Sequence, residues 1–174
     1  MPKTLLHFVH PALEKSQVNR RLLPVAHQLD DVAVNDLYEL YPDFHIDAKR
    51  EQALMESYER IVFQFPFYWY SGPALLKEWF DIVLEYGWAY GSLGKALVGK
   101  RASFVVTTGG PADSYTAEGH NGSTMGELLR PMFATLKLCG MILEEPLYIH
   151  NALHLNSQEQ SDCTAKYRRW LNAG

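Results

Sequence analysis

Hydrophobic and polar positions divide the chain into two kinds of segment. Short runs rich in β-branched and aromatic residues alternate with longer stretches of amphipathic spacing. A regular succession of strand and helix is typical of a parallel sheet covered by helices on both faces. The pattern therefore predicts a five-stranded, doubly wound α/β fold. The predicted strands are 4–10, 32–38, 60–67, 102–109 and 141–150, and the predicted helices are 16–29, 48–57, 73–86, 124–139 and 157–172.

Two irregular segments, 87–100 and 109–123, are longer than ordinary connections. Loops of this length in a compact domain are usually functional. The sequence has no internal repeat and no Pro/Gly-rich linker that would mark a boundary. We therefore expect a single domain over residues 1–174.

Charge and composition exclude several classes of protein. The net charge is -4 without a block of Lys or Arg, which argues against a nucleic-acid partner. The opening MPKTLLHFVHPA lacks the apolar core of a signal peptide, and no run approaches membrane-spanning length, so we expect a cytoplasmic protein. Cys139 and Cys163 are too few for a disulfide framework, and neither they nor the histidines have the spacing of metal ligands. We expect no metal site.

The loop after the first predicted strand leads to Ser16, a favoured helix N-cap, and then to a helix that begins near Val18 and Asn19. A helix N-terminus offers free backbone N–H groups to a phosphate. The loop lacks a G-x-G-x-x-G dinucleotide motif, so a phosphate monoester fits better. The alternative is that Ser16 only caps the helix and Asn19 faces solvent.

Four consecutive aromatic residues follow the third predicted strand. The strand ends at Pro66, and Phe67, Tyr68, Trp69 and Tyr70 come next. Core packing explains such a run poorly, because successive side chains point in different directions. The run predicts a platform for a planar ring. A hydrophobic subunit interface is the alternative.

The fourth predicted strand ends in hydroxyl and glycine residues, Thr107, Thr108, Gly109 and Gly110. Glycine lets a backbone approach a ligand closely. Because the carboxyl ends of parallel strands meet at one edge of a sheet, we expect the three loops to converge on one ligand crevice.

These motifs together resemble the flavodoxin-like NAD(P)H:quinone oxidoreductases. The likeness spans nearly the whole chain and rests on HPxxxxSxxN at 10–19, QFPxxWxxxPALLKxWFD at 64–81, GWAYG at 87–91 and TTGG at 107–110. LYELYPDFHID at 37–47 is nearer to the small ancillary flavoproteins of bacterial glutathione-gated potassium efflux systems. The resemblance implies a sheet order of 2-1-3-4-5, a bound flavin and a homodimer with its active sites at the interface.

The resemblance also implies roles for individual residues. The phosphate side of the flavin would be held by His10, Ser16, Gln17, Val18 and Asn19. The isoalloxazine ring would be surrounded by Phe67 to Tyr70 and by Thr108, Gly109, Gly110 and Pro111.

Two further residues are candidates for catalysis. Tyr115 follows TTGG as in the family and would stabilise charge on the reduced flavin. An ungapped comparison puts Asn121 where larger quinone reductases have a histidine, and a shift of one residue would let His120 take that place.

The function implied is hydride transfer, two electrons at a time, from NADPH or NADH to a quinone or another flat acceptor, in a ping-pong mechanism. The first loop suits one terminal phosphate, which favours FMN over FAD. One alternative is a regulatory subunit that docks on a potassium-efflux transporter and so lies at the inner membrane. The other is a one-electron carrier of the flavodoxin type.

Overall fold

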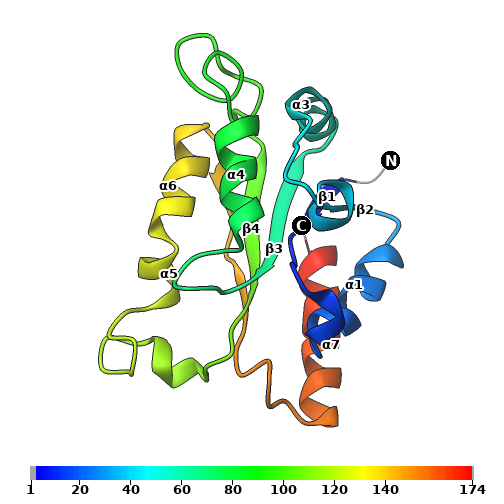
Figure 1. Cartoon of the computed structure of the whole chain (residues 1–174), viewed down its shortest axis with the longest axis vertical. Helices are drawn as coiled ribbons and strands as arrows, with labels where there is room; N and C mark the ends of the chain where they lie inside the picture. Colours follow the sequence, from blue (N-terminus) through cyan, green and yellow to red (C-terminus); the bar gives the residue numbers. More distant parts are fainter. Residues whose placement is uncertain (1–2, 174) are drawn as a thin grey trace.

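The computed structural model describes residues 3–173 and places a parallel sheet between two layers of helices (Figure 1). The strand order is β2-β1-β3-β4-β5, and β6 also pairs with β4. This order confirms the flavodoxin-like arrangement expected from the sequence. The strands are β1 (Thr4–Phe8), β2 (Val32–Asp36), β3 (Arg60–Pro66), β4 (Arg101–Thr107), β5 (Ile142–Leu143) and β6 (Leu147–Ile149).

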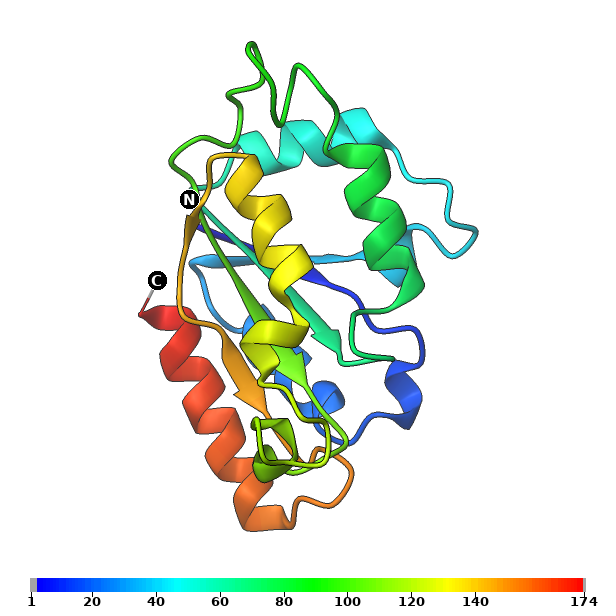
Figure 2. The ribbon, with the colours of Figure 1, turned by 90° about the vertical axis from the view of Figure 1, so that its left-hand side faces the viewer.

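Helices cover both faces of the sheet, as Figures 1 and 2 show from two directions. One face carries α1 (Asn19–His27) and α7 (Ser157–Asn172). The other carries α3 (Ala48–Glu56), α4 (Ala74–Val83), α5 (Met125–Leu128) and α6 (Arg130–Leu138), while α2 (Leu37–Leu40) follows β2 directly.

Alternation along the strands builds a separate core on each face. Phe63 and Phe104 belong to the core under α3, α4 and α6. Their neighbours in the strands, Val62 and Val105, belong to the core under α1 and α7. This period of two is the pleat of a strand buried on both sides.

The fifth predicted strand, 141–150, is divided into β5 and β6 in the structure. Ser103 Oγ donates to the carbonyl oxygens of Glu144 and Glu145, each at 3.2 Å, and Pro146 has no N–H to give to a ladder. The Glu144 carboxylate also forms an ion pair with Arg60, with Nε and Oε2 2.7 Å apart. After the N–H of Glu144 donates to the carbonyl of Ala102 at 2.9 Å, these side-chain contacts hold the segment between β5 and β6 against the neighbouring strands.

The predicted helix 124–139 is likewise divided, into α5 and α6. Pro131 lies in the first turn of α6, where the absence of a backbone N–H is tolerated. Pro131 cannot donate to the carbonyl of Glu127 as a continuous helix would require, and the helix is interrupted just before it, at Leu129. By contrast, α1 continues through Pro24.

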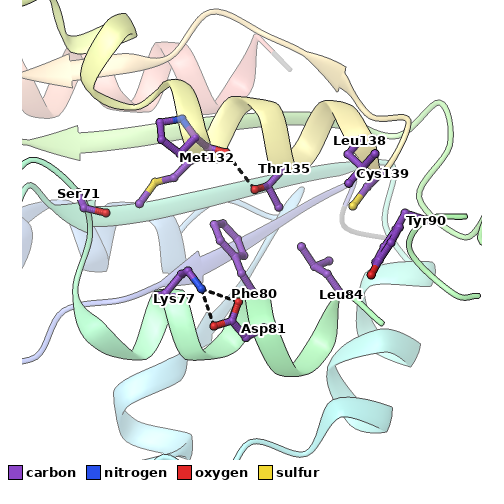
Figure 3. Close-up of a pocket in the computed structure, with 11 residues that line it drawn as sticks. Ser71, Lys77, Phe80, Asp81, Leu84, Tyr90, Met132, Thr135, Leu138 and Cys139 are labelled. Carbon is purple, nitrogen blue, oxygen red and sulfur yellow. Dashed lines mark hydrogen bonds and ion pairs between the residues drawn. The ribbon is translucent and has the colours of Figure 1, made fainter. Parts of the chain in front are cut away.

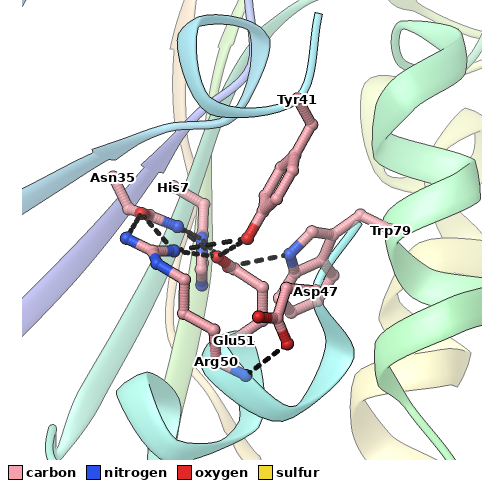
Figure 4. Close-up of polar contacts among 7 residues, drawn as sticks. All are labelled: His7, Asn35, Tyr41, Asp47, Arg50, Glu51 and Trp79. Atoms are coloured by element: carbon pink, nitrogen blue, oxygen red, sulfur yellow. Dashed lines mark hydrogen bonds and ion pairs between the residues drawn. The ribbon is translucent and has the colours of Figure 1, made fainter. Parts of the chain in front are cut away.

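A buried carboxylate ties the elements on the α3 side together (Figure 4). Glu51 in α3 accepts hydrogen bonds from Asn35 Nδ2 at 2.8 Å, Tyr41 Oη at 2.8 Å and Trp79 Nε1 at 3.0 Å, and it is paired with Arg50. The four donors satisfy a charge that burial alone would disfavour. They connect α3 to β2, to the end of α2 and to α4.

His7 lies beside this cluster in the middle of β1 and is fully buried. Its Nδ1 is 3.1 Å from Asn35 Nδ2, and its ring stacks on Phe63 with centroids 5.0 Å apart. Within residues 3–173 its Nε2 has no hydrogen-bond partner. Burial, helped by the nearby charge of Arg50, lowers the pKa of His7 to about 3.

Candidate active site

A cleft of about 350 Å³ opens at the carboxyl ends of β1, β3 and β4. It forms where the sequence predicts a crevice, because the three loops that follow these strands meet at one edge of the sheet. The predicted residues in its walls are His10, Ser16, Gln17, Asn19, Pro66, Phe67, Tyr68, Thr107, Thr108 and Gly109.

One end of the cleft, called the anion end below, presents free hydrogen-bond donors of the kind that bind anions. Ser16 Oγ accepts hydrogen bonds from the backbone N–H of Asn19 at 3.1 Å and from Asn19 Nδ2 at 3.2 Å, so the hydroxyl proton of Ser16 stays available to a ligand. Across residues 3–173, no group accepts a hydrogen bond from the backbone N–H of Gln17 or Val18. The N-cap residue of α1 is Val18 rather than Ser16. Ser16 Oγ nevertheless accepts the N–H of Asn19, the first residue of the helix, and the N–H groups of Gln17 and Val18 are left as free donors.

Asn19 is buried rather than facing solvent, which overturns the alternative reading of this position. Its Nδ2 donates to Thr107 Oγ1 at 3.0 Å, and its Oδ1 accepts from Gln64 Nε2 at 3.0 Å. Gln64 Oε1 in turn accepts from Tyr167 Oη of α7 at 2.6 Å. This relay joins α7, β3, α1 and the end of β4 beneath the cleft.

His10 lines the cleft as a neutral side chain that can donate a hydrogen bond. Its Nδ1 accepts from the backbone N–H of Ala12 at 3.2 Å, so the proton of the neutral ring is on Nε2. Burial lowers the pKa of His10, and the nearby charge of Glu14 offsets this only in part.

The aromatic segment forms a two-residue hairpin. Tyr68 and Ser71 exchange backbone hydrogen bonds of 3.1 and 3.0 Å, and both residues between them adopt left-handed backbone angles, with φ of 48° at Trp69 and 61° at Tyr70. Turns of this kind normally use Asn and Gly, and each bulky residue in this region costs about 1 kcal/mol or more. Trp69 is 94% exposed. The strained turn thus leaves the Trp69 ring exposed next to the cleft, which makes this segment a candidate for ligand or partner contact.

Tyr115, at the end of the short 3-10 helix Ala112–Tyr115, packs edge-on against Phe67 with centroids 5.8 Å apart. Tyr70 Oη donates to Asn121 Oδ1 at 3.2 Å. His120 is exposed and borders a separate hollow with Asp113 and other residues of its own loop. The geometry therefore brings Asn121, and not His120, to the aromatic hairpin.

The remaining predicted residues lie next to the cleft rather than in its walls. Val18 packs into the core under α1, so only its backbone faces the anion end. The others occupy the adjoining loops: Trp69, Tyr70, Gly110, Pro111 and Tyr115.

Sequence reasoning missed Lys15, Ala152 and Leu153, which also line the cleft, and Gln64 beneath it. Ala152 and Leu153 follow β6, so the rule that ligands bind at the carboxyl edge of the sheet applies to them too. Gln64 is a polar residue inside an apolar strand, and that was the available signal.

A second hollow, of about 370 Å³, lies between α4 and α6 (Figure 3). Its exposed rim carries the ion pair Lys77–Asp81. The hydroxyl of Thr135 donates a hydrogen bond to the carbonyl oxygen of Pro131 at 3.0 Å and is therefore not free for a ligand. Burial raises the pKa of the Cys139 thiol to about 11, which leaves it a poor nucleophile. The first cleft is therefore the candidate active site.

Within residues 3–173, no group of three or more His, Cys, Asp or Glu side chains could hold a metal ion. In the same part of the chain, no helix is long and apolar enough to cross a membrane.

Comparison with known proteins assigns the chain to a family. The family model described as Flavodoxin-like fold matches residues 2–173. The chain belongs to this flavodoxin-like family. Among the relatives, the glutathione-regulated potassium-efflux system ancillary protein KefG of Pectobacterium atrosepticum is 46% identical over 99% of this chain and 94% of its own length.

Solved structures of other proteins agree with this fold over almost the whole chain. General stress protein 14 from Treponema denticola, solved in complex with FMN, has a TM-score of 0.93 and 40% identity and covers 99% of both chains. An NADPH-quinone reductase from P. pentosaceus has a TM-score of 0.88 and 30% identity and covers 98% of both chains.

Proposed function

We propose that this chain is a flavin-dependent NAD(P)H:quinone oxidoreductase that binds FMN in the cleft at the ends of β1, β3 and β4. The observation that carries the proposal is the pairing, in one cleft, of free helix N-terminal donors with an aromatic wall. The similarity to an FMN-bound protein and to an NADPH-quinone reductase supports it.

The anion end fits one phosphate group. Ser16 O–H, His10 Nε2–H and the N–H groups of Gln17 and Val18 would bind it, and Lys15 in the wall adds a positive charge. Together with the positive end of the α1 dipole, these donors suit a phosphate monoester. The proposal therefore favours FMN over FAD.

The other end fits a flat ring. Phe67 and Tyr68 supply apolar walls, and Gly109 presents only its backbone to the cleft. When bound, the flavin would accept a hydride from NADPH or NADH and pass two electrons to a quinone. The residues of this chain would orient the ring and limit the access of water, and Tyr115 would support negative charge at the ring edge.

The order of reaction in this proposal is ping-pong. Because one cleft would hold the flavin, donor and acceptor would use the same place in turn, as that mechanism requires. The resemblance also favours a homodimer, in which the exposed Trp69 would be covered by the partner.

An absorbance spectrum tests the proposal first. We expect purified protein with FMN to give flavin bands that bleach with anaerobic NADPH or NADH and return with a quinone. Ser16→Ala should weaken FMN binding about 10-fold, because one hydrogen bond to a charged group is lost. Ser57→Ala, at the exposed end of α3, is the control and should bind normally. Absence of FMN binding to the wild type would refute the proposal.

The similarity to KefG supports a second role, as a regulatory subunit on a potassium-efflux transporter. The protein would then be cytoplasmic and peripheral at the inner membrane. Co-purification with membranes that contain such a transporter, and faster potassium efflux when the protein is added, are the expected results. Potassium efflux that is unchanged by the protein would contradict this role and leave the proposed oxidoreductase activity unaffected.

A further inference from the structure

His150 follows β6 directly and lies beside the cleft, although no motif in the sequence marks it. Its Nδ1 is 2.9 Å from Thr108 Oγ1, and its ring stacks on Tyr115 with centroids 5.3 Å apart and planes inclined by 27°. One half-buried side chain thus contacts both the Thr108–Gly110 turn and the Tyr115 ring.

The direction of the hydrogen bond fixes the tautomer of this histidine. The Thr108 hydroxyl donates to the carbonyl of Gly110 at 2.8 Å, so the oxygen of the hydroxyl accepts from His150 Nδ1–H. Burial and the charge of Lys166 on α7 lower the pKa of His150, which keeps the ring neutral. Tyr115 and Tyr148 are the other titratable residues against the ring.

The backbone of the same segment braces the turn. The N–H of Thr108 donates to the carbonyl of Ile149, the N–H of Asn151 to Gly110, and the N–H of Ala152 to Thr108, each at 2.9 Å. The segment 149–152 therefore holds the Thr108–Gly110 turn on one side, and His150 adds a side-chain contact to the hydroxyl.

Tyr115 is packed closely on the same turn. A Cβ at Gly110 would lie only 3.2 Å from Tyr115 Oη, so the phenol rests against the glycine while His150 covers the ring. Any shift of the turn would displace Tyr115, because the two share this contact and the same histidine.

We propose that His150 is a positioning residue of the flavin site, which holds the Thr108–Gly110 turn and the Tyr115 ring in one arrangement toward the cofactor. This inference rests on the proposed function. It adds a residue to the site that acts through Thr108 and Tyr115 rather than by touching substrate.

Two variants separate the two contacts of His150. His150→Phe keeps an aromatic ring on Tyr115 and removes the donor, whereas His150→Asn keeps a donor near the position of Nδ1 and removes most of the ring. His154→Phe is the matched control, because His154 is exposed in the same segment. The measurements are the dissociation constant of FMN by fluorescence quenching, the reduction potential of the bound flavin, and the urea midpoint without flavin.

We expect His150→Phe to weaken FMN binding about 5- to 10-fold, the loss of one hydrogen bond, and to shift the reduction potential. His150→Asn should bind within about 3-fold of wild type, since the bond to Thr108 is restored. Thr108→Val combined with His150→Phe should weaken binding no further than Thr108→Val alone, because both remove the same bond. His154→Phe should match wild type in all three measurements.

Wild-type affinity and potential in His150→Phe would overturn the inference and leave the proposed function intact. A loss of urea stability that accompanies the loss of affinity, without rescue by Asn, would mean a merely structural role and would overturn it as well. Nitrogen-15 NMR of the flavin-free protein gives an independent check, and a proton on Nε2 instead of Nδ1 would contradict the geometry. Failure of the wild type to bind FMN would refute the proposed function and this inference together.

Discussion

At the scale of single residues, His7 and His10 show how burial and hydrogen bonding assign different tasks to one residue type. They are three positions apart, and burial lowers the pKa of both. His10 has an N–H at the edge of the cleft, whereas His7, within β1, is packed against the rings of Phe63 and Trp79. The first is a candidate ligand-binding group, and the second is a pH-sensitive element of the core.

His7 should make the stability of the fold depend on pH. The unfolded chain protonates His7 near pH 6.5, but the folded chain resists protonation to about pH 3. The unfolded state therefore binds more protons in this window, and stability is lost as the pH falls through it. Between pH 6.5 and 4.5 this amounts to about 2–3 kcal/mol. In urea unfolding, His7→Phe should lose that much less than wild type over the same range, and the exposed His45→Phe should behave as wild type.

The left-handed turn at Trp69 predicts a conflict between stability and binding. Trp69→Gly should raise the free energy of unfolding by about 1 kcal/mol, because glycine adopts positive φ without strain. It should weaken FMN binding about 3- to 10-fold through the loss of an aromatic contact. Phe44→Gly is a matched control: Phe44 also has positive φ, at 65°, but lies outside the cleft. Equal FMN affinity in wild type and Trp69→Gly would exclude a role for the indole in binding.

At the scale of elements, the sequence predicted the sheet and the converging loops well, because apolar strands and carboxyl-edge loops have local signatures. It failed where a partner distant in sequence decides the outcome. Ser103 and Arg60 lie about forty residues or more from the strand that they interrupt at Glu144. His150 was missed for the same reason: its role comes from Thr108 and Tyr115, and no spacing within its own segment indicates it.

The buried carboxylate of α3 should contribute far more to stability than an exposed one on the same helix. Glu51→Gln replaces an acceptor of four donors with an amide, whose own N–H₂ would face them, and should cost about 2–4 kcal/mol. Glu56→Gln is a close control, because Glu56 also accepts an indole N–H, that of Trp88 at 2.7 Å, but at the surface. It should cost less than about 1 kcal/mol. Urea unfolding of both variants measures the difference, and similar losses would show that the cluster in Figure 4 does not stabilise the fold.

At the scale of the whole molecule, the groove between α4 and α6, with the exposed Leu138 in its lining, is a candidate for the proposed dimer contact (Figure 3). The protein, of 19.9 kDa per chain, should sediment as a dimer. Leu138→Glu should shift the equilibrium toward monomer by placing a charge in the interface. Leu40→Glu, on α2 and outside the groove, should not. Sedimentation of the wild type as a monomer would refute the dimer.

The relay from Tyr167 through Gln64 and Asn19 to Thr107 has a consequence for how the cleft is assembled in the cell. During synthesis, strands β1 to β4 are made before α7, which carries Tyr167. Without Tyr167, Gln64 lacks the hydroxyl donor that orients its amide. The hydrogen bond from Gln64 to Asn19, which orients Asn19 toward Thr107, is then weaker. Cofactor loading should therefore wait until Tyr167 has joined the fold, and fragments that stop before Tyr167 should bind the flavin poorly.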